Sequence, residues 1–241
     1  MVGMLAYPAF SRLPATLGIS LFALAASAVD PGPSAAATCP AAFVRMTRLL
    51  AAPFTTNAVT YDSSFVDVFG AHITFDRTLG TLSLEAGSGG RLAVAVRVVE
   101  ALDVTGVAPG TPVSGVLELV LEGYSQQNCG GAGCGVQLEG TLVAQADSVV
   151  ADANQIGPAA WTRPLATTLA LPLAFVAGSP VRAEFALVYG TGPGQTDAAG
   201  HLSGRYRVRG LPDGVHAVAC AGGDVTPVRG ATWGALKSRY R

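Results

Sequence analysis

The sequence predicts an all-β fold, an antiparallel, jelly-roll-like β-sandwich of about nine to eleven strands. Hydrophobic side chains alternate with polar ones over many runs, such as 72–76 and 181–189, and a period of two is typical of strands. Clusters rich in glycine and proline separate the runs at a spacing of roughly ten residues, which is typical of sandwiches and barrels. Because periodicity does not distinguish a sandwich from a closed barrel, the barrel is the alternative fold.

The alternating runs follow one another within residues 39–223, which we interpret as one domain. The runs that indicate strands are 72–76, 81–85, 92–98, 117–122, 181–189 and 202–208. The turn clusters between them are 108–112, 177–180, 190–194 and 212–214. We expect the uncharged stretch 164–181 to form two buried strands around a turn, because Pro172 and Gly178 interrupt it.

Residues 1–28 are expected to be a secretory signal peptide. A single cation, Arg12, precedes an apolar run at 13–26, and small residues end the segment. The run is about 14 residues long and a membrane-spanning helix needs about 20, so a retained anchor is the weaker alternative. We therefore expect a flexible leader at 29–38 and a secreted, extracellular or cell-surface protein, or a periplasmic one, with no membrane span after cleavage.

The four cysteines of an exported chain are expected to form two disulfides, for which three pairings exist. Cys129 and Cys134 enclose a short loop that is mostly glycine, so we pair them, which leaves Cys39 to pair with Cys220. A zinc site is the disfavoured alternative, because Cys39 and Cys220 have no closely spaced partner other than His216. We expect no metal and no cofactor.

The near balance of 15 basic and 16 acidic residues disfavours nucleic-acid binding. Residues 224–241 differ from the body, since an extended linker leads to a tail with basic and no acidic side chains. We expect a short C-terminal helix there, with Trp233, Leu236 and Tyr240 on one face and Lys237 beside them. It either docks on the acidic body or is a recognition tail for a protein partner, sorting machinery or an anionic surface.

Polar residues at period two from His201 to Arg209 predict one polar sheet face. Its three arginines, Arg205, Arg207 and Arg209, have planar donors that suit sulfate, phosphate or the carboxylates of an acidic glycan. The alternative is a solvated face on which the arginines pair with acids of neighbouring strands. The candidate acids are Glu118, Glu122 and Glu184.

Trp161 is a second candidate for ligand binding. We expect it in a loop, where its indole ring is either a platform for stacking of a sugar or a buried residue that caps the sandwich.

No group of residues indicates a catalytic centre. Asp197, His201 and Ser203 are close in sequence, but no Gly-x-Ser-x-Gly elbow accompanies them. His72, His201 and His216 are too scattered to predict a metal site. We therefore expect a protein without catalytic activity, and a secreted hydrolase is the least supported hypothesis.

Four segments share the same strand-end and turn chemistry: 102–106, 109–113, 171–181 and 211–215. In them the chain resembles a loose group of exported bacterial β-sandwich surface proteins, including the ectodomains of PEP-CTERM sorted proteins. The end of the sequence departs from that group, without a Pro-Glu-Pro signal and a following hydrophobic helix. The resemblance implies an extracellular location and no known catalytic activity.

The favoured function is that of a secreted or surface-associated, non-catalytic β-sandwich that serves as a structural, matrix or adhesive component. The alternative is a carbohydrate-binding module that uses the face from Arg205 to Arg209 or Trp161. Either function implies a surface polysaccharide or a protein as partner.

Overall fold

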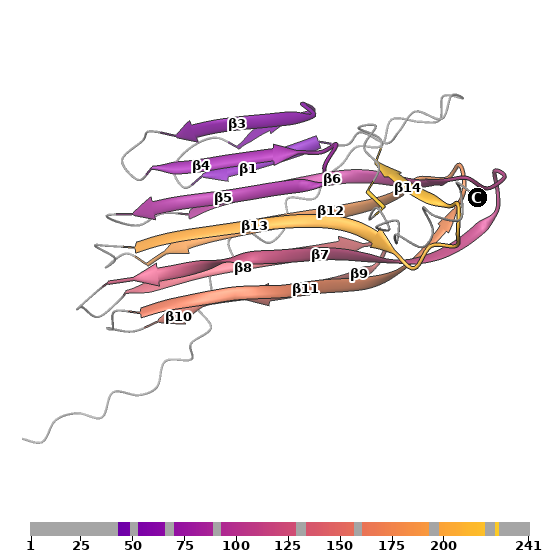
Figure 1. The fold of residues 1–241 in the computed structure, drawn as a ribbon. Coiled ribbons are helices and arrows are strands. Elements are labelled where there is room, and N and C mark those ends of the chain that lie inside the picture. Colours follow the sequence, from indigo (N-terminus) through magenta and orange to yellow (C-terminus); the bar gives the residue numbers. More distant parts are fainter. Residues whose placement is uncertain are drawn as a thin grey trace, which may run out of the picture. The chain divides into compact units, whose positions relative to one another are not determined.

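The computed structural model describes residues 43–48, 53–65, 70–88, 93–128, 134–156, 161–192, 198–219 and 225–226. These residues form 14 strands in two antiparallel sheets that pack as a sandwich (Figure 1). The all-β sandwich predicted from the sequence is confirmed. Within these ranges, no helix has the length and hydropathy needed to cross a bilayer.

The eight-stranded sheet, called sheet A, has the order β10-β8-β12-β6-β1-β2, with β9 paired to β8 and β14 paired to β6. Its strands are β1 (Phe43–Arg48), β2 (Phe54–Thr56), β6 (Ala93–Thr105), β8 (Gly135–Ala144), β9 (Asp147–Asp152), β10 (Gln155–Ile156), β12 (Val181–Thr191) and β14 (His216–Ala219). β12 and β6 lie in the middle of this order and pair with each other.

The six-stranded sheet, called sheet B, has the order β11-β7-β13-β5-β4-β3. Its strands are β3 (Thr60–Phe65), β4 (Ala71–Asp76), β5 (Thr81–Ser88), β7 (Pro112–Gln127), β11 (Trp161–Val176) and β13 (Ala198–Arg209). Because β13 pairs with β7 and β5, its outward side chains have neighbours on both sides.

The chain crosses between the sheets at most connections. From β5 to β8, and again from β11 to β14, successive strands always belong to opposite sheets, a winding that is typical of jelly rolls. Strands that lie side by side in sheet B, such as β7 and β13, are therefore far apart in the sequence.

The strands differ from the sequence prediction in number and in one turn. The 14 strands exceed the prediction partly because β2, β10 and β14 are too short for an alternation to be recognised. The predicted turn at 177–180 does lie between β11 and β12, but Pro172 lies inside β11. β11 is an edge strand of sheet B, where a residue without an N–H is tolerated.

The core lies between the sheets and consists of the inward half of each alternation. In β7 the inward residues Leu117, Leu119 and Leu121 are fully buried. Phe185 from sheet A stacks on Tyr206 from sheet B, with 4.0 Å between ring centroids. The burial of this apolar surface is the main term that stabilises the sandwich.

A buried ion pair joins the turn after β4 to the interior of sheet A. Arg77 donates from Nε and from a terminal nitrogen to the two carboxylate oxygens of Glu100 in β6, and the side chains are only 4% and 0% exposed. Tyr206 donates its hydroxyl at 3.3 Å to Glu100 Oε1, and Arg77 also donates to the carbonyl oxygens of Asn57 and Ala58. Buried charges are tolerated when they are paired and hydrogen-bonded in this way.

The surroundings of this ion pair set two pKa values. Burial lowers the pKa of Arg77, but the hydrogen bond and the charge of Glu100 together outweigh it, so the net shift is upward. Burial and then the charge of Glu100 raise the pKa of Tyr206. The guanidinium therefore stays charged and the phenol stays a donor across the physiological pH range.

The packed body continues beyond residue 223. Val225 belongs to the predicted linker, but it is buried, accepts a hydrogen bond from the Val208 N–H and donates one to the Ala217 carbonyl. Residues 227–241 of the predicted linker and tail lie outside the described residues, as do the predicted signal peptide (1–28) and leader (29–38). The tail residues concerned are Trp233, Leu236, Lys237 and Tyr240.

Candidate functional site

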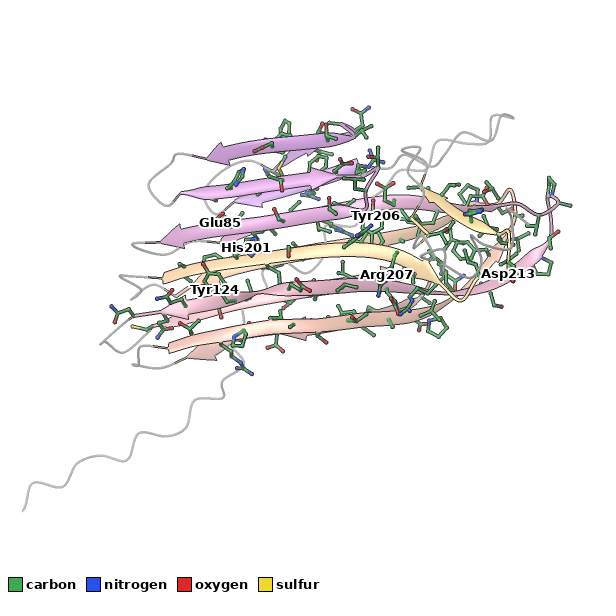
Figure 2. The ribbon with its side chains drawn as sticks, viewed as in Figure 1. Glu85, Tyr124, His201, Tyr206, Arg207 and Asp213 are labelled. Atoms are coloured by element: carbon green, nitrogen blue, oxygen red, sulfur yellow. The ribbon has the colours of Figure 1, made fainter. Side chains whose placement is uncertain are left out.

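The outer face of sheet B holds most of the residues singled out in the sequence. Along β13 the inward residues are buried, and the outward residues are half-buried or exposed. The outward residues include His201, Ser203, Arg205, Arg207 and Arg209. The period of two thus places them on one face, and Figure 2 shows His201 and Arg207 along this strand.

His201 lies at the centre of a row of side chains that crosses four strands. In register, His201 is opposite Tyr124 of β7 and Glu85 of β5, and Glu85 is opposite His72 of β4. We call these four residues the Tyr124 row; Figure 2 labels three of them, on neighbouring strands. The rings of Tyr124 and His201 are 6.5 Å apart between centroids and tilted by 32°, and Tyr124 is 40% exposed. The row presents an aromatic surface next to a carboxylate.

A second row of polar groups lies one outward position further along the strands. Its members are Glu122, Ser203, Ser83 and Thr74. Ser203 donates its hydroxyl to the carbonyl oxygen of Glu122 at 3.0 Å, and the hydroxyls of Thr74 and Ser83 are 2.6 Å apart. These contacts hold the hydroxyl groups in place.

The carboxylates around the Tyr124 row differ in their partners. Asp62 Oδ1 is 2.6 Å from His72 Nε2. Glu85 and Glu122 are exposed, and neither forms an ion pair with another side chain in the described ranges. Their oxygens are acceptors that a ligand can reach.

The arginines lie at the other end of β13 from His201. Arg207 donates from Nε to Glu118 Oε2 at 2.8 Å, and Arg209 donates to Glu118 Oε1 at 3.5 Å. Arg205 is exposed and has no ion-pair partner within the described part of the chain. Two of the three arginines therefore share one carboxylate.

Glu184 is not a partner of these arginines. It lies on β12 of sheet A and forms an ion pair with Arg97 of β6. The sequence alone does not reveal this, because it does not show which strands share a sheet. The structure also separates His201 from the arginine pair: Arg207 is six residues away along β13, about 20 Å in a strand.

Trp161 begins strand β11 and does not lie in a loop, so that part of the prediction is wrong. Its backbone is in register with Gln127 of β7, and its side chain lies outside the described ones. The choice between a sugar platform and a buried cap therefore stays open. The neighbouring β11 residue Pro164 is exposed and lies in register with Tyr124, so it extends the Tyr124 row to the sheet edge.

The three histidines lie on separate strands, His72 and His201 in sheet B and His216 in sheet A. In the ranges that the structure describes, no three His, Cys, Asp or Glu side chains are grouped so as to hold a metal ion. Asp197 lies outside those ranges, and the Ser203 hydroxyl donates to the Glu122 carbonyl.

The cysteine pairing stays a prediction. Cys39, Cys129 and Cys220 lie outside the described residues, and Cys134 is buried directly before β8.

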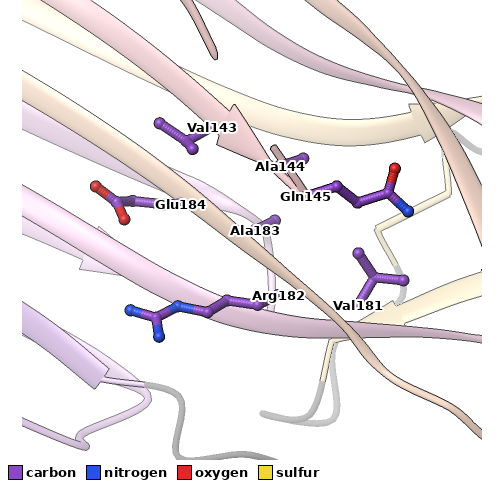
Figure 3. A pocket seen from close by; sticks show the side chains of 7 residues that line it. All are labelled: Val143, Ala144, Gln145, Val181, Arg182, Ala183 and Glu184. Carbon is purple, nitrogen blue, oxygen red and sulfur yellow. The ribbon is translucent and has the colours of Figure 1, made fainter. Parts of the chain in front are cut away.

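A pocket of about 290 Å³ lies where β8 ends and β12 begins (Figure 3). It is lined by Val143, Ala144, Gln145, Val181, Arg182, Ala183 and Glu184. Two of its polar groups have partners elsewhere, since Gln145 donates to the Ala174 carbonyl at 3.1 Å and Glu184 is paired with Arg97. This pocket thus has fewer open polar groups than the Tyr124 row.

No family model matches the chain, and no curated protein matches it. A solved structure with partial similarity is the carbohydrate-binding module TmCBM61, in complex with β-1,4-galactotriose. The TM-score is 0.27 and the sequence identity 8%, over 63% of this chain and 88% of that chain. A TM-score this low does not establish a shared fold or ligand.

Sequence reasoning missed Tyr124 and Glu85. The alternation of β7 contains the signal for Tyr124, because the outward positions that include Glu118 and Glu122 continue to Tyr124. Tyrosine is enriched at interaction surfaces, because its ring packs against a partner while its hydroxyl stays hydrated.

Proposed function

We propose that this protein is a non-catalytic β-sandwich that attaches to carbohydrate through the outer face of sheet B, as an adhesive or matrix component outside the cell. The observation that carries the proposal is the Tyr124 row. It combines an exposed aromatic ring with an imidazole and with a carboxylate that has no ion-pair partner in the described ranges.

Sugars suit this combination of groups. Their C–H faces pack on aromatic rings, and their hydroxyls donate to carboxylate and imidazole acceptors. The row also lies on hydrogen-bonded strands and not on loops, so little ordering is needed when a ligand binds.

The location outside the cell is part of the proposal. It is supported by the signal-peptide pattern at 1–28 and by the four cysteines. Expression of the full chain with sequencing of its mature N-terminus tests this part, and we expect cleavage after Ala28 and no reactive thiol. A cytosolic product with its leader intact would contradict it.

Binding to a panel of polysaccharides, measured by affinity electrophoresis, tests the carbohydrate part. We expect Tyr124→Ala to weaken binding about tenfold, or ~1.4 kcal/mol, because the stacking surface is lost. The matched control is Phe54→Ala, which removes an aromatic ring that is 50% exposed on β2 of sheet A and should leave binding unchanged. Equal effects of the two variants, or no binding to any polysaccharide, would refute the proposal.

A further inference from the structure

We propose that the ligand of the Tyr124 row is a neutral polysaccharide and not an acidic one; this rests on the proposed function. The inference comes from the distribution of charge on the outer face of sheet B. Three carboxylates lie in or beside the row, whereas each arginine of β13 lies at least four residues from His201. The carboxylates are Asp62, Glu85 and Glu122.

The distance along β13 decides which charges a bound ligand meets. Four residues of a strand span about 13 Å, which exceeds the screening length of about 8 Å at physiological ionic strength. Arg205, the nearest arginine, is in register with Val120, between the outward positions of Glu118 and Glu122. Glu122 lies one outward position from the Tyr124 row and Arg205 lies two, so a ligand at Tyr124 meets this carboxylate before Arg205.

The two arginines further along β13, Arg207 and Arg209, form ion pairs with Glu118. This carboxylate is 13% exposed and accepts hydrogen bonds from both Arg207 and Arg209. A sulfate or carboxylate group of a ligand would have to compete with Glu118 for the same donors.

Glu85 and Glu122 favour ligands that donate hydrogen bonds. An ionised carboxylate only accepts hydrogen bonds, so it pairs with sugar hydroxyls but not with a uronate or a sulfate ester. Like charges brought together at a binding surface weaken binding. An extended neutral chain lying across the strands could contact Tyr124, His201 and Glu85 in turn without that penalty.

Two polysaccharides with one backbone provide the test. The neutral polysaccharide that binds best is compared with its carboxymethylated derivative in affinity electrophoresis at physiological ionic strength, where the arginines of β13 are screened. We expect the derivative to bind the wild-type protein at least about tenfold more weakly. In the double variant Glu85→Gln/Glu122→Gln the difference should fall below about threefold, because the amides carry no charge.

Matched variants separate charge from other effects. Glu139→Gln/Asp152→Asn removes two carboxylates from sheet A and should leave the difference unchanged, as should Arg207→Ala. Two results would overturn the inference while the proposed function stands: a difference that persists in the Glu85/Glu122 variant, or tighter binding of the derivative that Tyr124→Ala abolishes. If Tyr124→Ala binds both polysaccharides like the wild type, the proposed function itself fails.

Discussion

The Arg77–Glu100 pair in the core and the Arg207–Glu118 pair on the outer face of sheet B join the same kinds of side chain. In the core pair the arginine is 4% and the glutamate 0% exposed, and Glu100 has a second donor in Tyr206. In the surface pair the arginine is 32% and the glutamate 13% exposed. In the core, the loss of one partner leaves a charge without water, so the pair is coupled to folding. On the outer face water replaces a lost partner, so side chains there are free to serve recognition.

We expect the largest loss of stability from a substitution in the core. Glu100→Leu leaves the Arg77 guanidinium buried without its carboxylate, and we expect the free energy of unfolding to fall by about 3 to 5 kcal/mol in urea denaturation. The double variant Arg77→Met/Glu100→Leu removes both charges and should regain most of this loss. A single variant that loses less than about 1 kcal/mol would contradict the comparison.

The two buried tyrosines differ in whether the hydroxyl group has a hydrogen-bond partner. The Tyr206 hydroxyl is hydrogen-bonded, whereas the buried Tyr189 hydroxyl has no partner among the described residues, and burial raises its pKa. We expect Tyr206→Phe to lose about 1 kcal/mol and Tyr189→Phe to be neutral or slightly stabilising, because it removes an unsatisfied polar group. Thermal unfolding of the two variants in parallel checks this; a larger loss for Tyr189→Phe would reverse our interpretation.

The surface pair should contribute little to the free energy of unfolding. Glu118→Gln removes the carboxylate that Arg207 and Arg209 share, and we expect a loss of at most about 1 kcal/mol, which decreases further at high salt. Denaturation at two salt concentrations measures it. A loss as large as that of Glu100→Leu would show that exposure does not separate the two pairs.

We expect the smallest loss of stability from substitution of Asp76, and this loss depends on pH. The Thr78 hydroxyl, and the N–H groups of Leu79 and Thr78, hold the pKa of Asp76 below its ordinary value of 3.8, against a smaller opposing effect of burial. A folded pKa below the unfolded one contributes stability above the unfolded pKa, which is lost as the pH falls through the folded pKa. Asp76→Ala should therefore lower Tm slightly at neutral pH, and the difference should vanish in strong acid. A difference independent of pH would contradict this.

The sandwich was predictable because its long strands alternate over many residues. β12 and β13 follow their predicted runs closely, since each has one buried and one solvated face. The ion pair was not predictable: Glu100 interrupts an apolar run, and its partner Arg77 lies 23 residues away in a turn. Nothing local in the sequence indicates that the two side chains meet.

The candidate site was predictable only in part. The alternation of inward and outward side chains predicts that His201 and Arg205 lie on the same face, because both are outward positions of one strand. The placement of His201 between Tyr124 and Glu85 depends on the order and register of three strands. That order follows from how the chain crosses between the sheets, which local patterns do not specify.

Sugar binding at the Tyr124 row is tested by titration of the ¹⁵N-labelled protein with a neutral oligosaccharide of the best-bound polysaccharide, followed by NMR. We expect the largest shifts at Tyr124, His201 and Glu85, with the amides of sheet A unchanged. Shifts confined to the pocket at Val143 and Glu184 would show that the sugar does not bind at Tyr124.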